Sequence, residues 1–184
     1  MSSVDLIHLH DPDDQLAQAA AEAYPELVRA RDEGLVRAIG VGTNSADVAS
    51  YLMDRVDLDV VLLAGRYTLL DRSGRALLDR AAERGVAVIA AGVFNSGLLA
   101  DPRPGASYDY GPADDALLAR ALRLQETCQR YDVPLRAAAI GWPARHPAVV
   151  SVLVGVRSPA EVDDAFAMAA VEIPEPLWAE LPAS

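Results

Sequence analysis

Residues 36–65, VRAIGVGTNSADVASYLMDRVDLDVVLLAG, contain one complete strand, helix and strand pattern. Two short apolar runs rich in β-branched residues lie at its ends, and a segment of helical period begins between them near Ser45. Runs that are apolar on both faces are typical of parallel strands covered on both sides. This stretch therefore predicts a β-α-β unit in an α/β protein with a parallel sheet.

The same alternation extends along the chain, so we expect about five β-α units. The predicted strands are Val4 to His10, Val36 to Gly42, Val60 to Gly65, Val86 to Ala91 and Val149 to Val154. The predicted helical segments begin near Asp13, Ser45, Arg72, Ala113 and Ser158. The fourth helical segment carries an apolar stripe that we expect to pack on the sheet, formed by Leu117, Ala121, Leu124, Cys128 and Tyr131. A further helical stretch, 135–145, is interrupted by Pro143.

Local signals set several helix boundaries. Ser158, followed three residues later by Glu161, predicts a capping box at the start of the last helix. Gly34 is expected to end the first helical segment in the left-handed conformation, and Pro25 to divide that segment or start its second half. Residues 93–112 lack periodicity and predict a long loop after the fourth strand.

Composition favours a single domain over residues 1–184 and excludes several kinds of partner. The chain has 184 residues, 52% of them hydrophobic, and a net charge of -11 from 27 acidic and 16 basic residues, which would repel nucleic acid and anionic membranes. The lone Cys128 excludes an internal disulfide framework and a thiolate zinc site, and we expect no bound metal. No apolar run is long enough for a bilayer and no signal peptide is visible, so we expect a cytoplasmic location.

In parallel β-α architectures the ligand site lies at the carboxyl ends of the strands. The last predicted strand ends in Gly155, followed by Arg157 and a helix start at Ser158, a combination suited to an anion such as phosphate. The alternative is a tight turn and an ordinary cap. His10 stands at the end of the first strand and could polarise a carbonyl, whereas we expect His8, one layer deeper, to be a hydrogen-bonded core residue.

Other motifs gain less support. The segment Gly40-Val-Gly42 follows a strand, but it lacks the third glycine of a dinucleotide-binding fingerprint. In such a fingerprint the ribose-binding carboxylate follows the next strand, whereas Asp57 and Asp59 precede that strand. Arg145 and His146 lie at the amino-terminal end of the last strand, and we expect them to be structural.

Taken in order, five segments resemble the second half of an aldo-keto reductase, a (β/α)8 barrel, and in particular its aldose- and pyridoxal-dehydrogenase branch. The resemblance covers nearly the whole chain. It rests on residues 5–14 (DLIHLHDPDD), 34–44 (GLVRAIGVGTN), 64–71 (AGRYTLLD), 93–99 (VFNSGLL) and 155–158 (GVRS).

The resemblance implies a role for each matching residue. It makes His10 the histidine that orients and polarises the substrate carbonyl. Thr43 and Asn44 match the pair that holds the nicotinamide carboxamide. The loop along the cofactor pyrophosphate is matched by Phe94, Asn95, Ser96 and Leu98, and the adenosine-phosphate turn by Gly155, Arg157 and Ser158.

Departures from the family pattern affect which cofactor we expect and how strongly it would be held. Glu161 stands where many members place an arginine for the extra phosphate of NADP, so the resemblance favours NAD, with NADP as the alternative. Ala64 replaces a frequent glutamine and Ala165 a frequent asparagine, which would weaken nicotinamide and adenine contacts.

The family's catalytic aspartate, tyrosine and lysine come from strands that precede the present first strand. We therefore expect a partial (β/α)8 barrel whose amino-terminal strands are missing, a truncated domain with two unpaired sheet edges. A homodimer or a partner chain is expected to cover those edges, unless the chain refolds into an open sheet with helices over both faces.

Two functions remain open. The first is an NAD(P)-dependent oxidoreductase that transfers hydride between nicotinamide and a sugar, aldehyde or hemiacetal, impaired or not by truncation. The second is a non-redox half-barrel descendant that serves as a partner- or ligand-binding scaffold, or as an enzyme using His10 for other chemistry.

Overall fold

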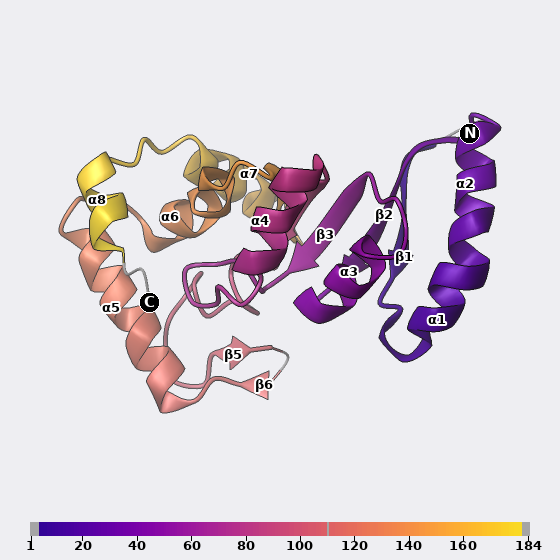
Figure 1. The fold of residues 1–184 in the computed structure, drawn as a ribbon. Helices are drawn as coiled ribbons and strands as arrows, with labels where there is room; N and C mark the ends of the chain where they lie inside the picture. Colours follow the sequence, from indigo (N-terminus) through magenta and orange to yellow (C-terminus); the bar gives the residue numbers. More distant parts are fainter. Residues whose placement is uncertain (1–3, 110, 182–184) are drawn as a thin grey trace.

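A five-stranded sheet forms the centre of the protein (Figure 1). The computed structural model describes residues 4–109 and 111–181. The strands run in parallel in the order β1-β2-β3-β4-β7. Their bounds are β1 Val4–His10, β2 Val36–Thr43, β3 Val60–Ala64, β4 Ala87–Ala91 and β7 Val149–Leu153. The sequence therefore predicted all five strands, with ends that differ by one residue at most.

Helices connect consecutive strands. The α-helices are α1 Leu16–Gln18, α2 Tyr24–Asp32, α3 Ala46–Met53, α4 Arg75–Arg84, α5 Asp115–Gln129, α6 Leu135–Gly141, α7 Pro159–Ala169 and α8 Glu175–Glu180. Shorter turns of other pitch are η1 Asp13–Gln15, η2 Ala19–Ala23 and η3 Pro143–Arg145. The helix expected near Arg72 begins later, at Arg75, because a turn in which Gly74 N donates to Arg66 O (2.7 Å) precedes it.

The first helical segment is composite. Residues 13–32 pass through a 3₁₀ turn, a short α-helix and the π-helical turn η2 before α2 begins. Pro25 lies in the first turn of α2, so it starts the second half of the segment, as predicted. Gly34 follows α2 with φ +74°, the left-handed conformation predicted for it.

One face of the sheet forms the first core. Strand residues alternate between faces, and on this face each strand from β2 to β4 places side chains that are 0–1% exposed, namely Ile39, Val41, Val61, Leu63 and Val88. Buried residues of α3 and α4 pack against them, including Leu52, Leu77 and Leu78. Helices α3 and α4 lie on the same side of the strands in Figure 1.

The opposite face is less covered. Leu62 and Ile89, paired across β3 and β4, are only half-buried, and Ser151 and Leu153 of β7 are exposed. Both edge strands expose apolar side chains as well, with Val4 at 42% and Val150 at 67%. The strands are therefore buried on one face, which differs from the expectation of cover on both.

A second core lies away from the strands. The stripe on α5 does not pack on the sheet as predicted: Ala121, Leu124 and Cys128 are buried with residues of α6, of α8 and of the loops after β3 and β4, including Leu69, Leu70, Leu98 and Leu99. Figure 1 shows α5 beside α8, at the other end of the molecule from β1. The α5 stripe therefore packs against the loops after β3 and β4, each of which contributes two buried leucines, and not against the strands.

The loop predicted over residues 93–112 has structure of its own. Its second half forms an antiparallel ribbon of β5 Ser107–Tyr108 and β6 Gly111–Pro112, with Ser107 opposite Pro112. We call residues 107–112, apart from Tyr110, which lies outside the described residues, the hairpin. The long loop predicted after the fourth strand is therefore present, and it contains a short hairpin that the sequence did not predict.

Candidate functional site

The carboxyl ends of the five strands meet at one edge of the sheet, because all five are parallel. This edge places five strand ends in the order His10, Thr43, Ala64, Ala91 and Leu153. The cavities along it include one of about 200 Å³ near the ends of β2, β3 and β4, one of about 470 Å³ between β4 and β7, and one of about 650 Å³ beside His10 at the end of β1. The first two share Asn95 and Ser96 in their linings, and we call them the small and the large cavity.

His10 ends β1 with its imidazole in solvent. The side chain is 82% exposed, and its Nδ1 lies 3.4 Å from Asp11 Oδ2. Asp11 takes a left-handed backbone conformation (φ 42°) and its N–H donates to Gly42 O at 2.8 Å, so it is a turn residue. His10 lies opposite Gly42 in the register, and no side chain on β2 covers it there.

His8 departs from its prediction. Its Nε2 atom is buried and has no hydrogen-bond partner, whereas we expected a hydrogen-bonded core histidine. Burial lowers the pKa of His8, and the neighbouring His10 lowers it further. Gly40 makes room for the ring, because a Cβ there would lie 2.7 Å from His8 Cδ2 and 2.6 Å from Val60 O.

Thr43 and Asn44, predicted as a pair, are separated by the end of β2. Thr43 is 2% exposed, and its Oγ1 accepts a hydrogen bond from Ser45 N (3.0 Å) in the turn that leads to α3. Asn44 is exposed and lines the small cavity. Asn44 therefore lines the small cavity, whereas Thr43 lines neither the small nor the large one.

The loop after β4 brings together the residues predicted for it. Asn95 is 5% exposed, accepts from Thr68 Oγ1 (2.7 Å) and donates to Gly65 O (3.2 Å). Asn95 and Ser96 both have positive φ, at 46° and 57°, and line both cavities. Phe94 lines the large cavity, whereas the Leu98 side chain is fully buried in the second core and lines neither cavity.

The turn after β7 forms the far wall of the large cavity. Gly155, Arg157 and Glu161 line it, and Ser158 is the N-cap of α7, accepting from Glu161 N at 3.2 Å. The second half of the predicted capping box is different: the Glu161 carboxylate accepts from Arg157 N (2.7 Å) and not from Ser158 N. The carboxylate thus occupies a backbone donor of the turn that was predicted to bind an anion.

Charges of both signs face the large cavity. Arg157 is 92% exposed and its Nη2 lies 3.6 Å from Glu161 Oε1. Arg136 forms an ion pair with Asp164 (Nη2 to Oδ1, 3.0 Å) on the same lining. A phosphate entering this cavity would meet two guanidinium groups and also two carboxylates.

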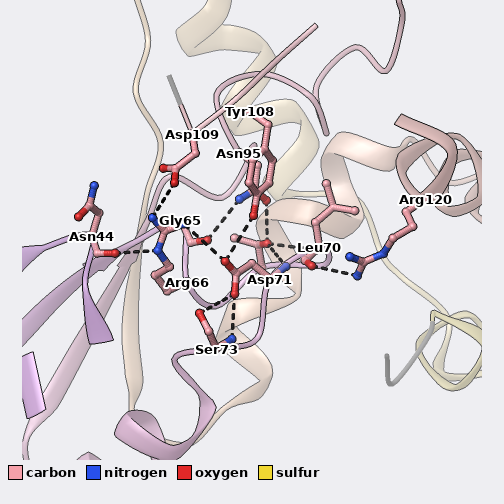
Figure 2. Close-up of polar contacts among 11 residues, drawn as sticks. Asn44, Gly65, Arg66, Leu70, Asp71, Ser73, Asn95, Tyr108, Asp109 and Arg120 are labelled. Carbon is pink, nitrogen blue, oxygen red and sulfur yellow. Dashed lines mark hydrogen bonds and ion pairs between the residues drawn. The ribbon is translucent and has the colours of Figure 1, made fainter. Parts of the chain in front are cut away.

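Sequence reasoning missed Arg66, which connects three segments beside the small cavity (Figure 2). Its Nε donates to Asn44 O at 2.7 Å, its Nη2 to Asp109 Oδ2 at 2.9 Å, and its Nη1 lies 3.5 Å from Asp71 Oδ2. The usable signal was its position: an arginine directly after the glycine that ends a strand. Asp109, in the hairpin, left no signal in the sequence.

Several groups lie outside the site. His146 is buried, accepts from Ala148 N through Nδ1 (3.2 Å) and contacts Asp79 through Nε2 (3.0 Å), which fits its predicted structural role. Tyr67 packs edge-on against His146, and Tyr51 lies under Arg55. Across residues 4–109 and 111–181 no cluster of three or more metal-ligating side chains forms, and no helix there has the length and apolarity to cross a membrane.

Comparison with known proteins identifies relatives for nearly the whole chain. The chain is 43% identical over 185 residues to D-threo-aldose 1-dehydrogenase from Pseudomonas sp, covering 98% of this chain and 56% of that protein. It is 42% identical over 160 residues to pyridoxal 4-dehydrogenase from Microbacterium luteolum, covering 86% and 47%. The chain thus spans about half the length of the curated relatives it matches.

The solved structures agree on the fold. The holo form of an aldo-keto reductase from Bacillus halodurans superposes with a TM-score of 0.80 at 21% identity, covering 98% of this chain and 60% of that one. A glycerol dehydrogenase from Gluconobacter oxydans gives a TM-score of 0.72 at 17% identity, covering 98% and 58%. The family profile described as "Aldo/keto reductase family" matches residues 1–183. The chain therefore belongs to the aldo/keto reductase family.

Proposed function

We propose that this chain carries the nucleotide-binding part of an NAD(P)-dependent oxidoreductase that transfers hydride between nicotinamide and a sugar, another aldehyde or a hemiacetal. The observation that carries the proposal is the pair of adjoining cavities at the strand ends, with Asn44 in one and the turn 155–157 in the other. Family membership and the names of the two dehydrogenases give the reaction class.

The residues present fit an extended dinucleotide. Gly92 has φ +63°, and a Cβ there would lie 2.9 Å from Gly65 N, so the ends of β3 and β4 approach as closely as backbone allows. Asn95 and Ser96 line both cavities and would hold the centre of the nucleotide. A Cβ at Gly155 would meet no atom within 4 Å, which leaves the backbone of that turn open to a phosphate.

The nicotinamide, when bound, supplies the two-electron hydride chemistry. A substrate of this class would present a hydroxyl or carbonyl oxygen at the carboxyl ends of the strands. The exposed His10 imidazole would hydrogen-bond that oxygen and orient it at the end of β1. All sixteen Lys and Arg residues of the chain are arginines, so these 184 residues do not supply the lysine that the family resemblance implies.

Glu161 favours NAD over NADP in this proposal. Its carboxylate already accepts the Arg157 N–H in the turn, so a phosphate on the adenosine ribose would meet a fixed negative charge. A ribose hydroxyl can donate a hydrogen bond to the same carboxylate. Glu161→Gln should then narrow the difference between NADH and NADPH affinity. Asp163→Asn is the matched control, because it removes an exposed charge from the same helix outside the cavity lining.

We further propose that the open edges of the sheet are covered by a second copy or by a partner chain. Support comes from the β7 side, where Val150 is 67%, Leu153 51% and Phe166 74% exposed. The same surface favours the second candidate function, a scaffold that binds a partner without redox chemistry. The two functions differ in whether nicotinamide nucleotides bind.

The deciding experiment is a titration of the 184-residue protein with NADH and NADPH, followed by nucleotide fluorescence, with the mass measured by light scattering in the same samples. Saturable binding with tighter NADH is the expected result. A folded protein that binds neither nucleotide would overturn the oxidoreductase proposal and leave the scaffold. A monomeric mass at all concentrations would contradict the second copy.

A further inference from the structure

Arg66 is held in one position by contacts with three separate segments (Figure 2). Its side chain is 20% exposed. Its three nitrogens contact the carbonyl of Asn44, the carboxylate of Asp71 and the carboxylate of Asp109. Burial lowers the pKa of Arg66, but the contacts with Asp109 and Asp71 raise it by more, so the net pKa is raised. The side chain therefore stays charged at all working pH values.

The contact with Asn44 acts on a backbone atom. Arg66 Nε donates to Asn44 O (2.7 Å), where β2 has ended and the turn to α3 begins. That hydrogen bond fixes the peptide of a residue lining the small cavity. A planar guanidinium can hold this carbonyl and two carboxylates at once, whereas an ammonium group has no such fixed fork.

The contacts with Asp109 and Asp71 fix the hairpin. Asp109 has φ 48°, a backbone conformation unfavourable for a residue other than glycine, and it lines the small cavity with Arg66. Tyr108, beside it, donates to Asp71 Oδ2 at 3.3 Å, the oxygen that faces Arg66 Nη1. The hairpin thus attaches to the loop after β3 through Arg66 and Asp71 and forms one wall of the cavity.

We infer that Arg66 is a positioning residue for the nicotinamide end of the site, which it builds by holding Asn44 on one side and the hairpin on the other. The inference rests on the proposed function, since it assigns the small cavity to nicotinamide. It does not make Arg66 a catalytic residue. Its role is to keep both walls in place before the ligand enters, which reduces the ordering that binding requires.

The test compares NADH with ADP-ribose, which lacks the nicotinamide. Arg66→Gln should raise the Kd for NADH about tenfold, equal to about 1.4 kcal/mol, and leave the Kd for ADP-ribose within about twofold. Arg66→Lys should recover only part of the loss, because it keeps the charge but not the fork. Asp109→Asn should weaken NADH in the same sense, and the double variant should lose little more than Arg66→Gln alone.

Arg103→Gln is the matched control. Arg103 lies in the loop after β4, which also contains the hairpin. It pairs with Asp101 (Nε to Oδ2, 2.6 Å) and is 68% exposed, but it lines neither the small nor the large cavity. It should change neither Kd. Amide hydrogen exchange gives a readout without nucleotide: the amides of Ser107, Tyr108, Asp109 and Gly111 should exchange faster in Arg66→Gln and not in Arg103→Gln.

The outcomes separate the two proposals. If the natural sequence binds neither NADH nor ADP-ribose, the proposed function fails and this inference fails with it. If it binds both, and Arg66→Gln weakens both equally or neither, the function stands and the positioning role is overturned. Unchanged exchange in the hairpin of Arg66→Gln would also overturn it.

Discussion

The two cores of this protein differ in the kinds of segment that form them. The first joins strand side chains such as Val61 and Val88 to the helices α3 and α4, so regular elements make both of its sides. The second joins α5, α6 and α8 to leucines of the loops after β3 and β4. The comparison teaches that this protein gives its site loops a hydrophobic core of their own: Leu98 and Leu99 anchor the loop whose Asn95 and Ser96 line both cavities.

Removing buried volume from each core should have the largest effect. Leu78→Ala in the first core and Leu98→Ala in the second, both at residues that are 0% exposed, should each lower the free energy of unfolding by about 2–5 kcal/mol. Urea unfolding followed by circular dichroism measures both. One shared transition in both variants would mean that the cores unfold as a unit, whereas a second, earlier transition confined to Leu98→Ala would show that the loop core opens by itself.

Glycine substitutions test how tightly the sheet packs away from the first core. Gly40→Ala should destabilise the fold by about 1–3 kcal/mol, because its Cβ would lie within 2.7 Å of His8 Cδ2 and Val60 O. Gly155→Ala is the control, since nothing lies within 4 Å of the added carbon. Equal thermal midpoints for the two variants would contradict the close contacts of Gly40 on β2 with His8 on β1 and Val60 on β3.

Cys128 reports on the second core without altering it. Burial raises the pKa of its thiol to about 11, so at pH 8 nearly all of it is protonated and unreactive. We expect alkylation by iodoacetamide only when the second core opens. Leu98→Ala should accelerate that labelling more than Leu78→Ala does, and equal acceleration would remove the distinction between the cores.

The smallest effect concerns pH and the first core alone. The hydrogen bonds from His146 and then Arg75 lower the pKa of Asp79, whose ordinary value is 3.8. A carboxylate with a lowered folded-state pKa contributes stability above its unfolded pKa and loses it as the pH falls through the folded one. The difference in urea midpoint between the natural sequence and Asp79→Asn should therefore shrink below about pH 3.8. A constant difference down to pH 2 would contradict this assignment.

Much of the fold could be predicted, because strand and helix periods are local. The five strands, Gly34 and the Ser158 cap are where their patterns put them. The stripe on α5 was predicted correctly as apolar, yet its partner was wrong. Periodicity identifies which side of a helix is buried and carries no information about what buries it.

The candidate site was predictable to a similar depth. Strand ends and family resemblance pointed to Asn44, Asn95 and Gly155, which line the cavities. Thr43 instead accepts a hydrogen bond within the turn that follows β2, and the Leu98 side chain is buried in the second core. Arg66 was missed because its importance comes from Asp109, 43 residues away in sequence.

The sequence alone determined the α/β class, the positions of the strands along the chain and their parallel direction, since these follow from alternation and short connections; it also predicted a ligand site at the carboxyl ends of the strands. Only the tertiary structure decided the pairing of Arg66 with the hairpin, the Glu161 carboxylate on the Arg157 N–H, and the burial of the α5 stripe against loops. The physical reason is range: backbone preferences act over a few residues, whereas side-chain contacts depend on segments that only the folded chain brings together.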